Sequence, residues 1–302
     1  MTELLPAAVL EEPPPDELDG GPGDPRGAGD GFRPGWQFWT AAGWLAFLVV
    51  VTALADVLPL ADPLRPDPRS AAAGPSTAHW LGTDPLGRDL LSRIVFGGRV
   101  SMLVAFFSVL IAASIGTLLG LVAGSAEGRI GSVIMGVLDI MLAFPALVLA
   151  LALTAFLGAS ARDVVIAISF VAIPVFGRLA RAQTLTFSKR EFVVASHASG
   201  ATATRTLVTE IVPNVLPPIL AFALLFAAVA IAIEGGLSFL GLGVPPPDPS
   251  WGGIIAAGQA KLDQAPHVSL IPAGVMFLTV LALHTAGEGV RSHFDRLAGV
   301  RT

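Results

Sequence analysis

Residues 101–124 read SMLVAFFSVLIAASIGTLLGLVAG, 24 residues in a row without one charged side chain. About 20 apolar residues are enough for a helix to cross the roughly 30 Å hydrocarbon core of a bilayer. Because no water is available there, every backbone N–H and C=O group has to be satisfied within the segment, which a helix achieves. Gly116, Gly120, Gly124 and then Gly128 recur every four residues, so a neighbouring backbone can approach one face of this helix closely. The stretch therefore predicts a membrane-spanning helix that packs tightly against another helix.

The composition extends this prediction to most of the chain. Of the 302 residues, 53% are hydrophobic and only 14% are charged, and the mean hydropathy is +0.73. A soluble domain carries about a quarter charged residues, so most of this chain is expected in lipid. Six segments in all reach spanning length, and they cover about residues 36–60, 99–124, 130–157, 163–186, 214–240 and 268–290. We expect an all-α, polytopic membrane protein with six transmembrane helices.

The first 35 residues differ from the rest. They are rich in Pro, Gly, Asp and Glu, as in EEPPPDELDGGPGDPRGAGDG at 11–31, and cannot bury enough apolar surface to offset chain entropy. No basic region leads into a short apolar stretch, so we do not expect a cleavable signal peptide. We predict a disordered acidic tail over residues 1–35 and a six-helix membrane domain over residues 36–302.

Missing residue types limit the chemistry. The chain has no Cys, which excludes disulfides, thiolate metal sites and cysteine nucleophiles. Neither of its lysines, Lys189 and Lys261, follows a glycine, so a phosphate-binding loop that ends in Gly-Lys-Ser/Thr is absent. Any ATP-driven work therefore depends on another chain. We expect no catalytic residue and no metal site in this one.

The positive charges predict the orientation. Cytoplasmic loops of membrane proteins carry an excess of Lys and Arg. Such residues surround the link between the fourth and fifth segments and follow the sixth: Arg178, Arg181, Lys189, Arg190 and Arg205, and then Arg291, Arg296 and Arg301. Both regions, and with six spans both termini, are therefore expected in the cytoplasm. The connection 61–98 is then external although it carries arginines of its own, because two basic regions outweigh one.

The cytoplasmic link at 187–213 predicts a helix–turn–helix unit. Residues 191–199 can form a short helix, and Gly200 suits the turn that ends it. Thr202 or Thr204 can cap a second helix, and Pro213 is tolerable near a helix start or a kink. Small side chains in the first helix leave room for close docking into a groove of another protein. An ordinary loop with helical tendency is the alternative.

The external segment 79–98 combines apolar residues at helical spacing with turn formers and charges. The apolar residues are Leu86, Leu90, Leu91 and Ile94, and the charged ones are Asp84, Arg88, Asp89 and Arg93. The spacing predicts an amphipathic helix at the outer membrane surface. The charged residues leave two roles open. They form either a gate or docking lip for a substrate-binding protein, or a structural plug in which the arginines pair with the aspartates.

Ionisable groups inside apolar segments are costly, and they indicate function by default. Asp139, Glu234 and His284 are such groups. Asp139 is expected within reach of an arginine near the cytoplasmic face. Glu234 precedes Gly235-Gly236, where the fifth helix can break and open onto a cavity. Each of the three is either a cavity residue or a structural residue whose polar group is satisfied.

The cytoplasmic link resembles the EAA loop of ABC importer permeases, in which Glu-Ala-Ala is followed by Gly four positions after the last Ala and later by Pro. The aligned triplet here is Val194-Ala195-Ser196, with Gly200 and Pro213 at the family's spacing. Val194 and Ser196 depart from the family's pattern. The resemblance implies that coupling to an ATPase subunit involves Glu191, Ala195, Ser196, His197, Ala198, Gly200 and Pro213.

Two longer stretches resemble the dipeptide/oligopeptide/nickel branch of that superfamily. HWLGTDPLGRDLLSRIVFGGRVS at 79–101 is similar to its His-x-x-Gly-Thr-Asp signature, and EGGLSFLGLGVPPPDPSWG at 234–252 is similar to the signature of its second permease subunit. The resemblance covers about residues 36–298. It implies a type I ABC importer architecture in a bacterial inner membrane, with half of the translocation pathway formed by this chain.

The resemblance also implies partners and cargo. The partners are a sister permease, ATPase subunits that bind ATP and Mg, an extracytoplasmic substrate-binding protein and lipid, with no cofactor in this chain and no nucleic acid. The cargo is dipeptides or short oligopeptides, with chelated nickel or haem as alternatives.

Two other functional classes remain open from the residues alone. One is a secondary transporter that uses Asp139 and Glu234 as ion sites. The other is an intramembrane serine hydrolase that uses Ser238 and His284, although the glycine that such a motif needs two residues after the serine is absent.

Overall fold

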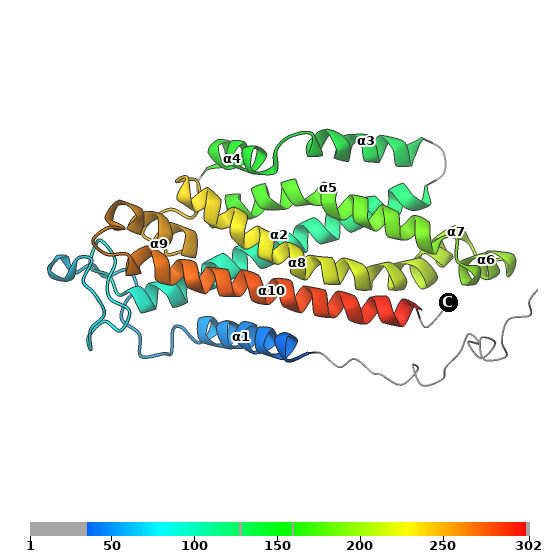
Figure 1. Ribbon diagram of the computed structural model, residues 1–302. Helices are drawn as coiled ribbons and strands as arrows, with labels where there is room; N and C mark the ends of the chain where they lie inside the picture. Colours follow the sequence, from blue (N-terminus) through cyan, green and yellow to red (C-terminus); the bar gives the residue numbers. More distant parts are fainter. Residues whose placement is uncertain (1–34, 127–128, 159, 300–302) are drawn as a thin grey trace, which may run out of the picture. The chain divides into compact units, whose positions relative to one another are not determined.

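The computed structural model describes residues 35–126, 129–158 and 160–299 (Figure 1). Between their loops these ranges are helical, and the one β-bridge within them joins Thr83 and Asp89. The all-α prediction is therefore confirmed. Residues 1–34 of the predicted tail, and Gly128, lie outside the described residues.

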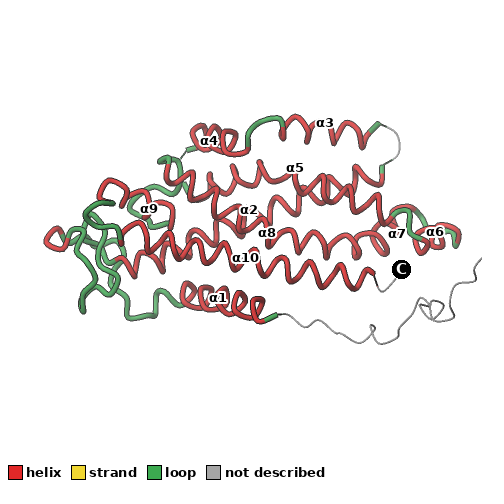
Figure 2. The backbone as a smooth tube through the Cα atoms, viewed as in Figure 1, coloured by secondary structure: helices red, strands yellow, loops and turns green. Residues whose placement is uncertain are grey.

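The helices follow one another along the chain, and the long connection between the first two covers residues 54–89 (Figure 2). They are α1 (Trp36–Ala53), α2 (Leu90–Ser125), α3 (Ile130–Leu142), α4 (Ala146–Leu157), α5 (Ala161–Phe187), α6 (Glu191–Ala198), α7 (Ala203–Thr206), α8 (Val212–Phe239), α9 (Trp251–Gly258) and α10 (His267–Gly299). A π-helical segment, Leu207–Ile211, joins α7 to α8, so that Ala203–Phe239 forms one long helix. Short 3₁₀ turns at Pro68–Ser70 and Gln259–Lys261 complete the set.

Within the described residues, five helices are long and apolar enough to cross a membrane. They are α1, α2, α5, the continuous helix that ends with α8, and α10. The sixth candidate is the pair α3 and α4, which meet at a bend of 85°. The number of predicted spans is therefore reached only when this bent pair counts as one span.

The span predicted over 130–157 is present only as a bent pair of helices. The helix stops after Leu142 and resumes at Ala146, directly after Pro145. Proline has no N–H to donate, and it disfavours helical geometry in the residue before it. At about 1.5 Å per residue, the 13 residues of α3 and the 12 of α4 are each too short to cross the bilayer alone.

The glycines at four-residue spacing pack α2 against α5, as predicted. A Cβ placed on Gly116 would lie 2.6 Å from the carbonyl oxygen of Ile173, and one on Gly124 would lie 2.7 Å from Cβ of Thr184. Between them, a Cβ on Gly120 would lie 2.6 Å from Cβ of Ala180. All of these distances are far below van der Waals contact. The two backbones therefore touch over more than two helical turns, which side chains on this face of α2 would prevent.

The amphipathic helix predicted over 79–98 does not form as a separate element. Residues 79–89 are a loop of turns in which Gly82 and Gly87 adopt positive φ angles of 84° and 79°. Asp89 then accepts a hydrogen bond from the backbone N–H of Ser92 and caps α2, which begins at Leu90. Residues 90–98 are therefore the first turns of the second membrane helix.

The long helices run side by side in the order of their contacts: α2 packs on α5 and α8, α8 on α10, and α10 on α1 (Figure 1). Trp44 of α1 donates to the hydroxyl of Thr279 on α10 at 3.2 Å. Arg99 of α2 donates to the carbonyl oxygens of Thr52 and Ala53, the last residues of α1. A cation at the C-terminus of a helix is favourable, so Arg99 both caps α1 and joins it to α2.

Two ends of this helix array matter for function. The first carries α6 and α7, between α5 and α8, and is called the α6 end (Figure 1). The second carries α9 and the loop of residues 54–89, and is called the α9 end (Figure 1).

Candidate functional site

The α6 end has the helix–turn–helix geometry that the sequence predicts. Gly200 adopts a φ angle of +84°, its N–H donates to the carbonyl of His197 at 2.9 Å, and the N–H of Ala201 donates to the carbonyl of Ser196 at 3.2 Å. These two bonds form a Schellman motif, which closes α6 and requires a left-handed residue. The hydroxyl of Thr202 then accepts from the N–H of Arg205 and caps α7.

The second helix of this unit continues without a break into the membrane. Pro213 lies in the first turn of α8, directly after the π-helical segment. The side-chain amide of Asn214 donates to the carbonyl of Glu210 at 2.6 Å, in the region where proline removes a backbone donor. Ala203–Phe239 is thereby one helix of 37 residues. The α6–α7 turn is therefore joined to a membrane-spanning helix with no loop between α7 and α8.

Opposite faces of α6 have different neighbours. Val193 is buried in the main hydrophobic core, and the half-buried Ser196 lies 3.3 Å from the hydroxyl of Thr206. The opposite side is exposed and comprises Glu191, Phe192, Val194, Ala195, His197 and Ala198; we call it the α6 outer face. Ser196 is therefore the one predicted contact residue of α6 that faces the protein's own core.

The α6 outer face also contains two bulky apolar side chains that we did not predict from the sequence. Phe192 is 40% exposed and Val194 is 59% exposed. In the sequence they appear only as hydrophobic residues of a short helix, and Val194 as a departure from the family's triplet. The sequence contained no signal for this, because it does not show which residue of the Phe192-Val193-Val194 run faces the core. Once Val193 does, its two neighbours are turned about 100° to either side of it.

At the α9 end, the charged residues of the external segment form a buried cluster around Asp84. Its Oδ2 lies 2.6 Å from Nε of Arg88 and 3.3 Å from Nε of Arg93. Its Oδ1 accepts from the backbone N–H groups of Leu86 and Arg88. Arg93 also donates to the carbonyl of Pro63 at 3.0 Å. One carboxylate thus organises both arginines and the turn between them.

Asp89 does not pair with either arginine. Its Oδ1 lies 2.9 Å from Nδ1 of His79, and its Oδ2 caps α2. Asp84, Arg88, Asp89 and Arg93 are all buried within the chain. Within residues 79–98, the exposed side chains are two apolar ones, Trp80 at 73% and Leu86 at 56%. The geometry favours a structural plug for these four charged residues and leaves Trp80 and Leu86 as the exposed side chains of this segment.

Glu234 connects three helices rather than opening onto a cavity. Its carboxylate is fully buried and accepts from the hydroxyl of Ser101 on α2 at 2.9 Å and from that of Ser238 on α8 at 2.8 Å. The hydroxyl of Ser101 in turn accepts from the backbone N–H of Trp251, the first residue of α9, at 3.1 Å. The predicted break at Gly235-Gly236 is wrong, since α8 continues to Phe239.

The small residues of the second signature have a packing role. A Cβ on Gly252 would lie 2.6 Å from Cα of Gly235 and 2.7 Å from Cβ of Ser238, so α9 can approach α8 only when residue 252 is glycine. The indole N–H of Trp251 donates to the carbonyl of Ile94 at 2.9 Å. The sequence SFLGLG…PSWG therefore holds α9 against α8 and α2.

The other two intramembrane polar residues lie on exposed faces. Asp139 of α3 pairs with Arg178 of α5, with 2.7 Å between Oδ1 and Nη2. This confirms the expected arginine partner of Asp139. His284 is exposed on α10, whereas the hydroxyl of Ser238 contacts Glu234 and Ser250. Ser238 and His284 therefore do not form a dyad.

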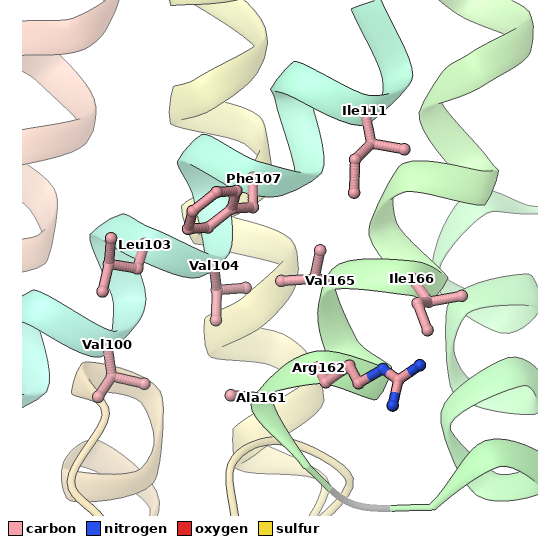
Figure 3. Close-up of a pocket in the computed structure, with 9 residues that line it drawn as sticks. All are labelled: Val100, Leu103, Val104, Phe107, Ile111, Ala161, Arg162, Val165 and Ile166. Carbon is pink, nitrogen blue, oxygen red and sulfur yellow. The ribbon is translucent and has the colours of Figure 1, made fainter. Parts of the chain in front are cut away.

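Two hollows lie on the outside of the described helices. The larger, of about 560 Å³, is an apolar groove between α2 and α5, where Val104 and Phe107 of α2 face Val165 of α5 and Arg162 supplies the single charge among its lining residues (Figure 3). The smaller, of about 360 Å³, lies between α3 and α5 and includes the Asp139–Arg178 pair. Among the residues that the structure describes, no group of three or more His, Asp or Glu side chains could hold a metal ion.

Comparison with known proteins gives a consistent result. Residues 116–297 match the family described as binding-protein-dependent transport system inner membrane component. The chain is 40% identical over 222 residues, 74% of either chain, to the glutathione transport system permease protein of Pectobacterium atrosepticum. It is 38% identical over 247 residues to the dipeptide transport system permease protein of Alkalihalophilus pseudofirmus, covering 82% of this chain and 81% of the relative. It is 39% identical over 273 residues to the di/tripeptide transport system permease protein of Pseudomonas aeruginosa, covering 86% and 90%.

Proposed function

The chain belongs to the family of binding-protein-dependent transport system inner membrane components, and from this we propose that it forms half of the translocation pathway of an ATP-driven importer of short peptides. It is a multi-pass inner membrane protein and a non-catalytic permease subunit of an ABC transporter.

The cargo we propose is peptides of two or three residues. The similar permeases are named for dipeptides, for di- and tripeptides and for glutathione, which is itself a tripeptide. These molecules share a small size, a free amino group and at least one carboxylate. Neither chelated nickel nor haem is named for these relatives, which makes short peptides the better-supported class.

The observation that carries the coupling proposal is the geometry of α6. Its inner residue Val193 is anchored in the core, its outer face is exposed, and its far end joins the continuous helix Ala203–Phe239. We assign the α6 outer face to an ATPase subunit, which binds the ATP and Mg that this chain does not. When ATP closes the ATPase pair, force on α6 reaches α5 on one side and α8 on the other. ATP then shifts the population from one access state to the other, because it binds the closed state more tightly.

The orientation and the other partners follow from this assignment. The α6 end is placed in the cytoplasm, and with six spans the two termini lie there as well. The α9 end then faces outward, where exposed Trp80 and Leu86 offer an apolar contact for an extracytoplasmic substrate-binding protein. A sister permease supplies the second half of the pathway.

Because the chain contains no cysteine, a single introduced cysteine tests the coupling assignment without background labelling. Val194→Cys on the α6 outer face is expected to cross-link to an ATPase subunit in membranes, with a yield that changes when ATP is added. Trp80→Cys, also exposed but at the α9 end, is the matched control and is expected to give no such product. Equal cross-linking from both positions, or none from Val194→Cys with an intact assembly, would reject the assignment.

Uptake into vesicles tests the cargo and the energy source together. Labelled dipeptide uptake is expected to require ATP and to be reduced by excess unlabelled tripeptide. Collapse of the ion gradients with ATP held constant is expected to leave uptake unchanged. Loss of uptake in that arm would favour an ion-coupled transporter instead.

A further inference from the structure

The smaller hollow, between α3 and α5, has a composition that the proposed transport role does not explain. Its lining residues are Met135 and Asp139 of α3 and Arg178, Arg181, Ala182 and Leu185 of α5. With about 360 Å³ of space it is large enough for a phosphate-sized group and part of an attached chain. We call it the α3–α5 pocket.

The α3–α5 pocket carries an excess of positive charge. Arg178 donates through Nε and Nη2 to the same oxygen of Asp139, at 3.1 and 2.7 Å. Arg181 has no such partner: in the described part of the chain its Nε is buried and makes no hydrogen bond. A buried N–H group of a charged side chain that makes no hydrogen bond costs free energy. An acceptor from outside this chain is therefore expected beside Arg181. Two arginines against one aspartate leave one net positive charge for an anion.

The depth of the pocket in the membrane narrows the choice of anion. α5 has 27 residues, or about 40 Å, which exceeds the roughly 30 Å hydrocarbon core by about 5 Å at either end when the helix is centred. Arg181 lies six residues before Phe187, the last residue of α5, or about 9 Å along the axis. Its long side chain therefore reaches the boundary between acyl chains and head groups, where long cationic side chains normally end.

The surroundings of the pocket are those of a surface that faces lipid. On α3, the exposed fractions of Val133, Val137 and Ile140 are 64%, 55% and 66%. Apolar side chains around a small cationic pocket match the chemistry of a phospholipid, with its phosphate at the arginines and its chains along the helix. Basic pockets between transmembrane helices on the cytoplasmic side bind anionic head groups by the same physics.

We propose that the α3–α5 pocket binds the phosphate of an anionic phospholipid, held between the guanidinium groups of Arg181 and Arg178. A guanidinium group presents its donors in a planar fork that fits phosphate oxygens. Asp139 competes with the lipid for Arg178 and so lowers the affinity of the site. The proposal requires only that the helices span the membrane, and it stands whether or not α6 contacts an ATPase subunit.

The test uses the full chain, purified through a tag with its co-purifying subunits and reconstituted in phosphatidylcholine nanodiscs that contain increasing phosphatidylglycerol. Native mass spectrometry counts the phosphatidylglycerol molecules that stay bound. Arg181→Ala is expected to weaken retention about tenfold, as for the loss of a charge-assisted hydrogen bond. Asp139→Asn is expected to strengthen it about threefold, because Arg178 is released from a half-exposed ion pair. Arg69→Ala, at an exposed position of the α9 end, is the control and is expected to change nothing.

The two variants are expected to change lipid retention in opposite directions. Misfolding cannot account for this result, since an unfolded protein does not retain lipid more tightly. Unchanged retention in Arg181→Ala, or weaker retention in Asp139→Asn, would overturn the proposal. Loss of the bound phosphatidylglycerol on addition of inorganic phosphate to the buffer would also overturn it, because the site would then bind free phosphate. An ion pair between Arg181 and an acidic residue of a sister permease, shown by cross-linking that persists in phosphatidylcholine alone, would also overturn it.

Discussion

Substitution of Gly200 separates the shape of the α6 turn from its contact with a partner. Gly200 has a φ angle of +84° and closes the Schellman motif of α6. An L-residue with a Cβ pays about 1–2 kcal/mol in this left-handed conformation, whereas asparagine tolerates it. A cost of this size changes the ratio of ordered to disordered turn by a factor of about 5–30. Gly200→Ala is therefore expected to loosen the connection between α6 and α8, and Gly200→Asn is expected to preserve it.

The assay is the number of peptides taken up per ATP hydrolysed in proteoliposomes that contain the whole transporter. For Gly200→Ala we expect this ratio to fall about fivefold or more while ATP hydrolysis continues, because force on α6 no longer reaches α8 efficiently. For Gly200→Asn we expect a ratio within about twofold of the unaltered protein. Equal ratios for the two variants would refute the reasoning that the left-handed turn carries the coupling.

A bulky residue at the same position reports on the partner. No heavy atom of a neighbouring part of the described chain lies within 4 Å of a Cβ built on Gly200. Gly200→Trp therefore adds bulk without a clash inside the chain, beyond the backbone strain that Gly200→Ala already measures. We expect Gly200→Trp to lose co-purification of the ATPase subunits while it still inserts into the membrane. Co-purification and uptake like those of Gly200→Ala would mean that no partner lies close to this turn.

Three further predictions concern stability, measured by thermal unfolding in detergent. Gly120→Ala forces α2 and α5 apart and is expected to lower the free energy of unfolding by about 1–3 kcal/mol. Gly136→Ala, with no atom within 4 Å of its Cβ, is the neutral control, and equal effects of the two variants would contradict close α2–α5 packing. Glu234→Ala removes the acceptor of two buried hydroxyls and is expected to lower the free energy of unfolding by about 1–3 kcal/mol, whereas Glu234→Gln is expected to stay closer to the unaltered protein. A Glu234→Gln protein less stable than Glu234→Ala would contradict these hydrogen bonds. Asp84→Ala leaves two buried arginines without their carboxylate and is expected to lower the free energy of unfolding by about 3–5 kcal/mol. Asp62→Ala, at an exposed position, is expected to have no effect, and a stable Asp84→Ala protein would show that the plug is dispensable.

Local features of this fold were predictable from the sequence because each depends on a few neighbouring residues. The positive φ of Gly200, the cap at Thr202 and the close packing at Gly116 and Gly120 follow from the absence of a Cβ or from a hydroxyl at the right spacing. The ion pair of Asp139 was also foreseen, since a carboxylate among apolar residues needs a cation and the next predicted span ends in arginines.

The errors have a common origin. Asp84 and Asp89 are equivalent in the sequence, and only the fold of residues 63–93 decides that Asp84 receives both arginines while Asp89 contacts His79. The span predicted over 130–157 contains Pro145, and a proline can either kink a helix or break it. In this chain α3 and α4 both pack against α5, and the bend between them is 85°.

The sequence by itself determined the class of the protein: membrane-spanning segments, a helix–glycine–helix link and two long signatures shared with a family of transport permeases. Only the tertiary structure decided which face of each helix meets protein. Helices that are apolar on all sides have no hydrophobic stripe to mark the core, because lipid tails and the protein interior are equally apolar surroundings for a side chain such as leucine. For this reason the inward position of Ser196, the outward positions of Phe192 and Val194, and the unpaired Nε of Arg181 beside the α3–α5 pocket emerged only from the packed helices.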